Sequence, residues 1–594
     1  MRTLFTLSLV AWLAAVAQPD QDAKLESLLA EAHHAQARSD FRRAAGAYRQ
    51  ALAIRPNLPE LWSNLGLMQH EAGEYSPALE SFHKALGLNP SLYVPNLFLG
   101  LDLLQLNRPR EATAYLLAAE KLNPADPQPV LALGRAFHKL WESEKSREWY
   151  ERATALVPRN GEAWYGLGLA HFGLAESAGA KLADWFRESA YAAELAASAL
   201  AEQGRLTEAI HAYRELLSSK AVPPRCSHAS YGFVLVRHGD LAGAGEEFRR
   251  DLESCPAARV GMARLLFESG EREKGLAMLA DLASADREGF ESSLPRFWEG
   301  LDMQQLATRL AALRESSGTI ADAVLARVRE GAVSAPLAEP ERPVPELRDA
   351  AGLQRFASDA FFSGHFRTAA RTSDRLRQRF PNDPAGWYWA VRANQRLGVA
   401  ALARAGEVDP DSPRIHALLG DLYQRRKMFD EAREEYAKML AISPASVAAL
   451  SGLAAAYFAE ARLEEAQATA QKALALNPAD SDVNLLMGQI LVARREYADA
   501  EPYLKQSLQA RADLLPRVHA LLGNVLARTG RSKEALMELT QGLASDEDGS
   551  VHYQLASLYR EAGDSKAAAA AFEKSKQIRA SHDELARKAL TPIN

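Results

Sequence analysis

A repeat of about 34 residues constrains this 594-residue chain more than any other feature of its sequence. Small residues recur at that interval, at Ala32, Gly66, Gly100, Gly134 and Gly168. Four more positions recur with the same spacing, and we call each such recurring position a column. They hold an alanine or serine twelve residues later, then an aromatic residue or leucine, a second alanine and a proline. A fixed period with these residue types predicts a series of antiparallel helix pairs.

The residue types explain why each repeat should form two helices. The small residue allows a neighbouring helix to approach closely. The two alanines flank the aromatic or leucine column and complete one apolar stripe along the second helix. In Asn89-Pro90 and Asn123-Pro124, proline ends that helix because it cannot continue it and disfavours helical geometry in the preceding residue. No segment has a strand pattern, so we predict an all-α fold.

These columns resemble the tetratricopeptide repeat family. The family's opening signature matches Trp62, Leu65 and Gly66, and its second half matches Ala78, Phe82, Ala85 and Pro90. The C-terminal half repeats the small column at Gly420, Ala454, Gly488, Gly523 and Ala556. The resemblance implies right-handed superhelical solenoids, with about 12–14 helix pairs in total. It also implies a non-enzymatic scaffold that binds segments of other proteins.

Departures from the period predict the domain organisation. One repeat opens at Trp164 and another at Trp387, and in both cases the following repeat begins about five residues sooner than the period predicts. This difference predicts a shortened or fused helix pair at each place. The pattern lapses after Phe290, and four prolines within residues 333–346 predict an extended linker. We therefore predict two consecutive arrays separated by a spacer and a linker. The predicted segments are a signal peptide at 1–17, an N-terminal array at 18–289, a helical spacer at 290–332, the linker at 333–346 and a C-terminal array at 347–594.

The N-terminus has the outline of a secretory signal peptide. A basic start, an apolar run from Leu4 to Ala14 and the small-residue triplet Ala15-Val16-Ala17 precede Gln18. The alternative, a membrane anchor, needs about 20 apolar residues, and polar sequence begins sooner here. We expect cleavage, a mature chain without a transmembrane segment, and a periplasmic or extracellular location.

The two cysteines lie in one degenerate repeat. Cys226 falls at the start of its first helix and Cys255 at the end of its second, and antiparallel packing brings those ends together. We expect a disulfide, which suits an exported protein. Two free thiols, or a metal site that uses His228 and His238, are the alternatives.

First helices line the concave wall of such a solenoid, where family members bind partner segments. In the N-terminal array the positions facing this groove are apolar: Leu97, Leu101, Leu104, Leu131, Tyr165, Leu169 and Phe172. In the C-terminal array they are polar: Arg392, Arg414, Asp421, Arg425, Asn524 and Arg528. We expect both sets to contact partner proteins or peptides. The alternative for the apolar set is that neighbouring helices or the N-terminus cover it.

Charge and composition narrow the function further. The chain has 70 basic and 76 acidic residues, and a net charge of −6 argues against sequence-independent binding of nucleic acid. No unassigned segment is long enough for a separate catalytic domain, so we expect no catalytic residue. We also expect no cofactor and no metal. The alternatives are an accessory subunit of an export, envelope-assembly or glycosyltransferase system, or a protein that binds a small ligand or a carbohydrate. The last would place Trp387, Tyr388 and Trp389 in a pocket.

Overall fold

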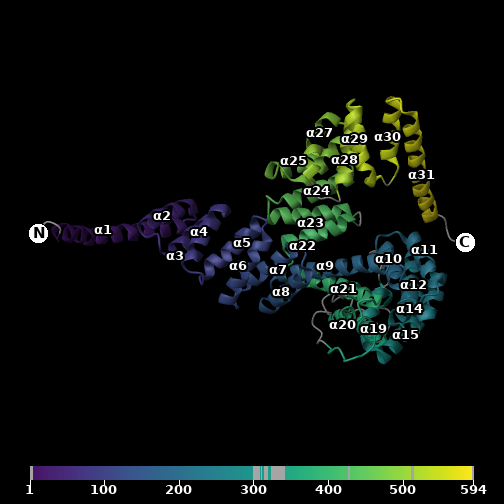
Figure 1. Ribbon diagram of the computed structural model, residues 1–594. Helices are drawn as coiled ribbons and strands as arrows, with labels where there is room; N and C mark the ends of the chain where they lie inside the picture. The colour runs from purple at the N-terminus through teal and green to yellow at the C-terminus, as the bar shows by residue number, and fades with distance from the viewer. Residues whose placement is uncertain are drawn as a thin grey trace. The chain divides into compact units, whose positions relative to one another are not determined.

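A computed structural model describes residues 4–298, 308, 311–313, 319–320, 322, 342–425, 428–509, 514–546 and 548–590. Its regular elements there are α-helices and short 3₁₀ turns, with no strand among these residues, which confirms the all-α fold (Figure 1). The chain divides into two compact units, and each unit contains two separate stretches of sequence. The first unit comprises residues 1–192 and 276–409, and the second comprises 193–275 and 410–594.

The first unit contains the helices before residue 192 and those on either side of the predicted linker. They are α1 (Leu4–Ala37), α2 (Phe41–Ile54), α3 (Pro59–Glu71), α4 (Tyr75–Leu88), α5 (Tyr93–Gln105), α6 (Pro109–Leu122), α7 (Pro127–Lys139), α8 (Ser143–Leu156), α9 (Gly161–Trp185), α16 (Arg287–Ser293), η1 (Leu294–Phe297), α19 (Ala350–Phe362), α20 (Phe366–Arg379) and α21 (Pro384–Val408). Two further helices, α10 (Ala190–Glu202) and α15 (Arg272–Ala285), run across the boundaries between the units.

The second unit continues the same alternation of first and second helices. It contains α11 (Leu206–Ser218), α12 (Ser227–His238), α13 (Leu241–Asp251), α14 (Pro256–Glu268), α22 (Pro413–Arg425), α23 (Phe429–Ile442), α24 (Val447–Ala459), α25 (Leu463–Leu476), α26 (Ser481–Ala493), α27 (Tyr497–Gln506), η3 (Ser507–Gln509), α28 (Leu515–Arg528), α29 (Ser532–Gln541), η4 (Gly542–Ser545), α30 (Ser550–Glu561) and α31 (Ser565–Leu590).

This division corrects the prediction of two consecutive arrays at 18–289 and 347–594. Of the predicted spacer, residues 290–298 and a few isolated positions are described, and of the linker only 342–346. The correction has a physical cause, because α9 and α21 pack along each other and draw residues 276–409 into the unit that begins the chain. Periodicity within one repeat carries no information on a pairing so distant in sequence.

Helices α9 and α21 also explain the early start of the next repeats. Each has 25 residues, whereas α3, α5, α7 and α19, which are also first helices of the first unit, have 13. The structure therefore shows fused helices at Trp164 and Trp387, rather than shortened ones. The two helices approach closely where glycine leaves space, since a Cβ on Gly398 would lie 3.0 Å from the ring of Phe172.

The small and aromatic columns meet inside each repeat. The ring of Tyr150 lies between Gly134 of its own repeat and Gly166 of the next. A Cβ on Gly134 would lie 2.8 Å from that ring, and a Cβ on Gly166 would lie closer. Gly420 and Gly452 flank the ring of Tyr436 in the same way in the second unit. The ring thus joins two consecutive repeats at positions where only glycine fits.

We expect Gly166→Ala to lower the free energy of unfolding of the first unit by about 1–3 kcal/mol, because Gly134 blocks the ring of Tyr150 from moving away. The matched control is Gly46→Ala in α2, where a Cβ meets no atom within 4 Å. That change should stabilise by about 0.5–1 kcal/mol, because alanine is the better helix former. Urea unfolding followed by tryptophan fluorescence measures both, and equal effects of the two variants would contradict the argument.

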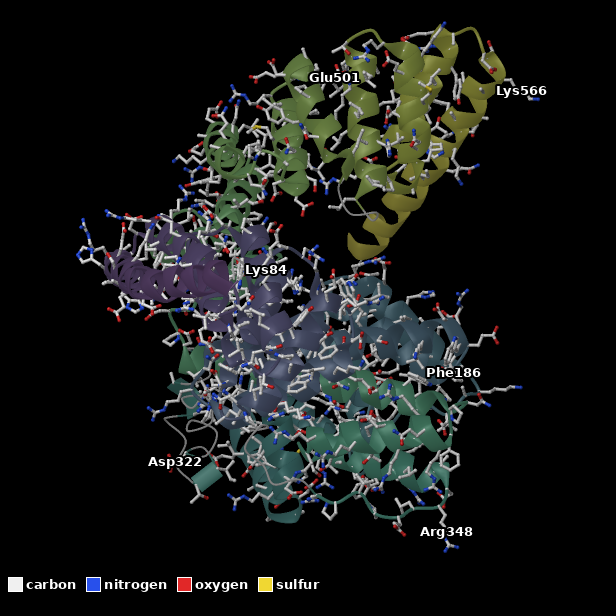
Figure 2. The ribbon with its side chains drawn as sticks, turned by 60° about the vertical axis from the view of Figure 1, so that its left-hand side comes forward. Lys84, Phe186, Asp322, Arg348, Glu501 and Lys566 are labelled. Carbon is white, nitrogen blue, oxygen red and sulfur yellow. A yellow bond between two sulfur atoms is a disulfide. The ribbon has the colours of Figure 1, made fainter. Side chains whose placement is uncertain are left out.

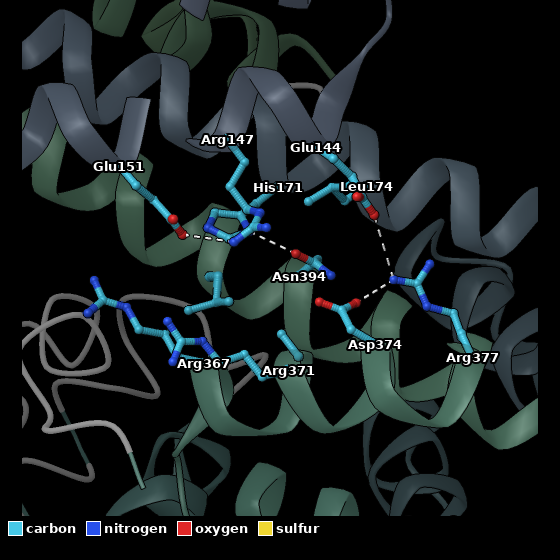
Figure 3. A pocket seen from close by; sticks show the side chains of 12 residues that line it. Glu144, Arg147, Glu151, His171, Leu174, Arg367, Arg371, Asp374, Arg377 and Asn394 are labelled. Atoms are coloured by element: carbon cyan, nitrogen blue, oxygen red, sulfur yellow. Dashed lines mark hydrogen bonds and ion pairs between the residues drawn. The ribbon is translucent and has the colours of Figure 1, made fainter. Parts of the chain in front are cut away.

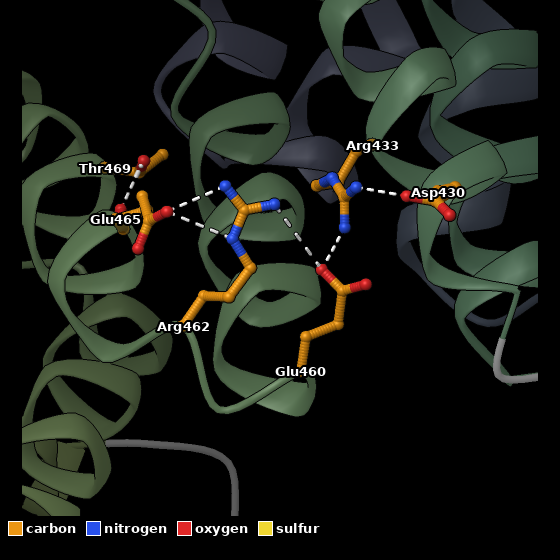
Figure 4. Close-up of polar contacts among 6 residues, drawn as sticks. All are labelled: Asp430, Arg433, Glu460, Arg462, Glu465 and Thr469. Atoms are coloured by element: carbon orange, nitrogen blue, oxygen red, sulfur yellow. Dashed lines mark hydrogen bonds and ion pairs between the residues drawn. The ribbon is translucent and has the colours of Figure 1, made fainter.

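Ion pairs connect consecutive repeats of the second unit at its surface. Figure 2 labels Glu501 on α27, whose carboxylate accepts a hydrogen bond from Arg531 at 2.5 Å, at the start of α29. In Figure 4, Glu460 lies between Arg433 of α23 and Arg462, which precedes α25. Arg462 also pairs with Glu465 at 2.7 Å, and its hydrogen bond holds the pKa of that carboxyl below its usual value.

The N-terminal segment forms part of α1, whose range includes most of the predicted signal peptide. Among the described residues, no helix is both long and apolar enough to cross a membrane. Cleavage after Ala17 stays a prediction.

Candidate functional site

The structure buries part of the apolar groove set. The side chains of Leu97 and Leu104 are 3% and 8% exposed, in a core cluster that residues of α7 complete. Leu131 is 8% exposed in a second cluster with Ala163 of α9. The expectation of an exposed strip is therefore wrong for these three leucines, because the next first helix packs on them.

The remaining apolar positions lie at least partly in helix contacts. Leu101 is half-buried against the core cluster of α5 and α7. Tyr165 and Leu169 are half-buried on α9, and the ring of Phe172 packs against α21 at Gly398. Phe172 therefore also fits the alternative that neighbouring helices cover the apolar set. Peptide binding by Leu101, Tyr165 and Leu169 stays a prediction.

The polar set divides between the two units. Arg392 belongs to α21 of the first unit, where its half-buried guanidinium lies over the rings of Phe361 and Tyr388 at 5.5 and 5.8 Å. Arg414 and Asp421 are exposed on α22, while Asn524 is half-buried and Arg528 exposed on α28. Arg425 ends α22, but its side chain lies outside the described residues.

Polar residues on two first helices of the second unit repeat in register. Arg414, Asp421 and Arg425 of α22 have the same spacing as Arg517, Asn524 and Arg528 of α28. The Asp421 carboxylate accepts a hydrogen bond from the Tyr436 hydroxyl at 2.6 Å, so it is already engaged within its repeat. Arg528 lies over the ring of Tyr497 at 6.0 Å. Arg414 and Arg517 are therefore exposed at equivalent positions of two first helices.

Histidine–glutamate pairs are a feature that our sequence reasoning missed. Each joins the first and second helices of one repeat, 19 residues apart, at 2.6, 2.7 and 2.6 Å: His228 with Glu247, His416 with Glu435, and His519 with Glu538. Burial raises the pKa of the Glu435 carboxyl, but hydrogen bonds from Lys438 and His416 outweigh it and the net pKa is lowered. The constant spacing of histidine and glutamate in the sequence could have revealed these pairs.

The cysteines are joined in the structure. Cys226 and Cys255 form a disulfide with a Cα–Cα distance of 5.5 Å, and both are buried. His228, the histidine of the alternative metal site, pairs with Glu247 instead. Among the described residues no group of three or more histidine, cysteine, aspartate or glutamate side chains is arranged to hold a metal ion.

The aromatic triplet of the carbohydrate-binding alternative lies in the core. Trp387, Tyr388 and Trp389 are 7%, 2% and 2% exposed, which corrects their placement in an open pocket. Trp387 packs edge-on against the ring of Trp185, which is itself 61% exposed, and the guanidinium of Arg377 lies 4.9 Å from the Trp387 ring.

A charged recess, open to solvent, lies beside the crossing of α9 and α21 in the first unit. Figure 3 shows charged side chains of α8 and α20 on opposite sides of His171 and Asn394. The recess is lined by Glu144, Arg147, Glu151, His171, Leu174, Arg367, Ala370, Arg371, Asp374, Arg377, Asn394 and Leu397. Four arginines and three carboxylates line it, so the arginines are in excess. Sequence reasoning missed this site because its two halves, at His171 and Asn394, lie 223 residues apart.

The centre of the recess is a buried histidine held by an amide. His171 is 4% exposed, and its Nδ1 lies 2.8 Å from Oδ1 of Asn394. Asn394 Nδ2 donates to the carbonyl of Ala390 at 2.8 Å, which fixes the amide so that Oδ1 faces the ring and His171 Nδ1–H donates. Burial, together with the charges of Arg147 and Arg367, lowers the pKa of His171 to about 4, although the hydrogen bond with Asn394 acts in the opposite direction. His171 is therefore neutral at pH 7.

Comparisons with the sequence models of known families agree with this architecture. Sequence models described as tetratricopeptide repeat match residues 29–92, 99–160, 194–259 and 392–447, residues 424–490 and 458–525, and residues 549–582. Three solved structures are similar to parts of the chain. A MamA protein is 25% identical over 25% of this chain and 82% of its own, with a TM-score of 0.25. YrrB, a TPR protein with an unusual peptide-binding site, is 21% identical over 32% and 95%, with a TM-score of 0.27. PilF of Pseudomonas aeruginosa is 18% identical over 39% and 91%, with a TM-score of 0.28.

Proposed function

Because the chain belongs to the tetratricopeptide repeat family, it is a protein-interaction scaffold, and we propose that it is exported and binds an acidic segment of a partner protein. The binding surface is the arginine-bearing side of the first helices in the second unit. The observation that carries this proposal is the recurrence of arginines in register on α22 and α28.

The chemistry of this surface favours carboxylates over apolar ligands. Arg414, Arg517, Arg528 and Arg560 are exposed on first helices of the second unit, and Asp421 is engaged by Tyr436. Guanidinium groups form charge-assisted, bidentate hydrogen bonds with carboxylates, which are stronger than neutral ones. Arginines on α22, α28 and α30 can therefore hold acidic side chains that are spaced apart along an extended segment.

We expect the double variant Arg414→Ala/Arg528→Ala to bind an acidic peptide at least about 10-fold more weakly than the unchanged chain, since each lost charge-assisted bond contributes about 1 kcal/mol or more. Fluorescence anisotropy with a labelled Glu-rich peptide measures this, and the same peptide with glutamine at each glutamate reports the part due to charge. The matched control is Lys472→Ala, which removes an exposed charge from the second helix α25.

Equal affinity for the two peptides, or equal losses in the double variant and the control, would contradict the proposed surface. Export is tested separately by the N-terminus of the protein recovered from a secreting bacterial host. A chain that begins at Gln18 supports the proposal, and a chain that still begins at Met1 contradicts it.

A further inference from the structure

The recess lies between two copies of one three-helix motif. His171 and Asn394 are separated by 223 residues, and shifting α7, α8 and α9 by that separation reproduces the bounds of α19, α20 and α21. The shift also relates Trp164, whose indole N–H donates to the Pro158 carbonyl at 2.8 Å, to Trp387, which donates to Pro381 at 3.5 Å. The two halves of the site thus share one backbone plan.

The copies face each other around a local two-fold axis. A Cβ on Gly168 would meet Leu402, and a Cβ on Gly179 would meet Val391. A shift of 223 residues leads from Gly168 to Val391, and the reverse shift leads from Leu402 to Gly179. The two contacts are therefore equivalent by exchange of the copies. The axis passes between His171 and Asn394, which occupy the same register. Ten of the twelve lining residues form such pairs: Glu144 with Arg367, Arg147 with Ala370, Glu151 with Asp374, His171 with Asn394, and Leu174 with Leu397.

The charges of the two copies differ at several of these positions. Where α8 carries Glu144, Glu148 and Thr154, α20 carries Arg367, Arg371 and Arg377. The fold does not require arginine at these positions, because the equivalent positions in the first copy accept glutamate or threonine in helices of the same length. The second copy therefore concentrates positive charge on one side of His171.

Part of that charge is not neutralised inside the recess. Arg147 pairs with Glu151 at 3.1 Å, and Arg377 pairs with Asp374 and, at 4.0 Å, with Glu144. Half-buried Arg367 makes no hydrogen bond or ion pair with any residue that the structure describes. Nε of Arg377 is a buried donor without an acceptor among those residues. A buried donor normally has an acceptor, so this group points to a ligand that supplies one, and the half-buried guanidinium of Arg367 is a second group in the recess that can bind an anion.

From these observations we propose that the recess binds a small oxyanion group, a phosphate or a carboxylate, on Arg367 next to His171. The planar guanidinium of Arg367 would hold two oxygens of the anion through parallel hydrogen bonds. The site is independent of the peptide surface of the second unit, so either proposal can fail alone.

Binding should be coupled to protonation of His171. Its Nδ1–H donates to Asn394, which leaves Nε2 to take up a proton. The charges that line the recess are Glu144, Arg147 and Glu151 from α8 and Arg367, Arg371, Asp374 and Arg377 from α20, while α9 and α21 contribute none. An added anion offsets the repulsion that Arg147 and Arg367 exert on a protonated ring. By linkage, the anion should bind more tightly as the pH falls, and it should raise the pKa of His171.

The test titrates the full chain with inorganic phosphate and, in a second arm, with acetate, while calorimetry measures affinity and NMR follows the imidazole signals of His171. We expect saturable binding of at least one anion, a shift of the His171 resonances, and at least about a 10-fold loss of affinity in Arg367→Ala. Binding in one arm alone identifies phosphate or carboxylate as the ligand group.

The matched control is Arg355→Ala, which removes an exposed arginine from α19 of the same unit and should leave affinity unchanged. Circular dichroism of Arg367→Ala checks that the variant is folded, and Arg367→Lys, which retains the charge without the planar fork, should recover part of the affinity. The proposal is overturned if neither anion moves the His171 signals, or if Arg367→Ala and Arg355→Ala bind equally well.

Discussion

Replacing Cys226 and Cys255 together by serine is expected to lower the free energy of unfolding of the second unit by about 2–4 kcal/mol. The disulfide closes a loop across 29 residues of sequence, and both cysteines are buried. Without it the unfolded chain gains conformational freedom, while the folded repeat keeps its other contacts. The expected result is an earlier transition in urea.

The distribution of tryptophan allows the two units to be followed separately. All nine tryptophans of the chain lie in the first unit, so their fluorescence reports on that unit alone, whereas circular dichroism reports on both. The double serine variant should shift a dichroism transition and leave the fluorescence transition in place. Reductant should shift the unchanged chain in the same way and have no effect on the variant. Two reactive thiols in the unfolded, unreduced chain would rule out the disulfide.

The first unit should lose on the order of 3 kcal/mol of stability between pH 6.5 and pH 4 through His171 alone. The pKa of this histidine is lowered to about 4 in the folded chain, by burial and by Arg147 and Arg367, from an ordinary value of 6.5. Between these values the unfolded chain binds the proton and the folded chain does not. Acid therefore favours unfolding, and stability rises as the pH returns to 6.5.

His171→Gln isolates this contribution, because glutamine does not titrate and retains an amide that can bond to Asn394. Urea unfolding of the first unit, followed by tryptophan fluorescence in buffer free of phosphate and carboxylate, is compared at pH 7 and pH 4.5. The stability of the variant should fall less than that of the unchanged chain over this interval. Parallel losses in both proteins would show that His171 does not carry the effect.

The repeat columns were predictable because they describe local packing. Gly134 lies on α7 and Tyr150 on α8, and the single hairpin that these consecutive helices form brings the two residues together. The same reasoning located the fused helices at Trp164 and Trp387 and placed the two cysteines near each other. In each case the partners belong to one repeat or to adjacent repeats.

The apolar groove shows where that reasoning stops. Register identifies the side of a helix on which Leu97 or Leu131 lies, but it does not say which neighbour covers that side. Residues of α7 and α9 bury these leucines, and α21 adds a further contact at Phe172. The buried Trp387, Tyr388 and Trp389 follow the same rule, since aromatic residues in sequence predict a pocket and a core equally well.

The sequence by itself determined the helical hairpin, its period and its close-packed columns, because these depend on residues within one or two repeats. Tertiary structure alone decided the discontinuous units, the burial of the predicted groove, and the recess around His171 and Asn394. The units and the recess depend on α9 meeting α21, a contact between segments 223 residues apart, whereas the groove is buried by the packing of α7 and α9. The repeat period is the same whichever repeats come together, so only the folded chain shows which ones do.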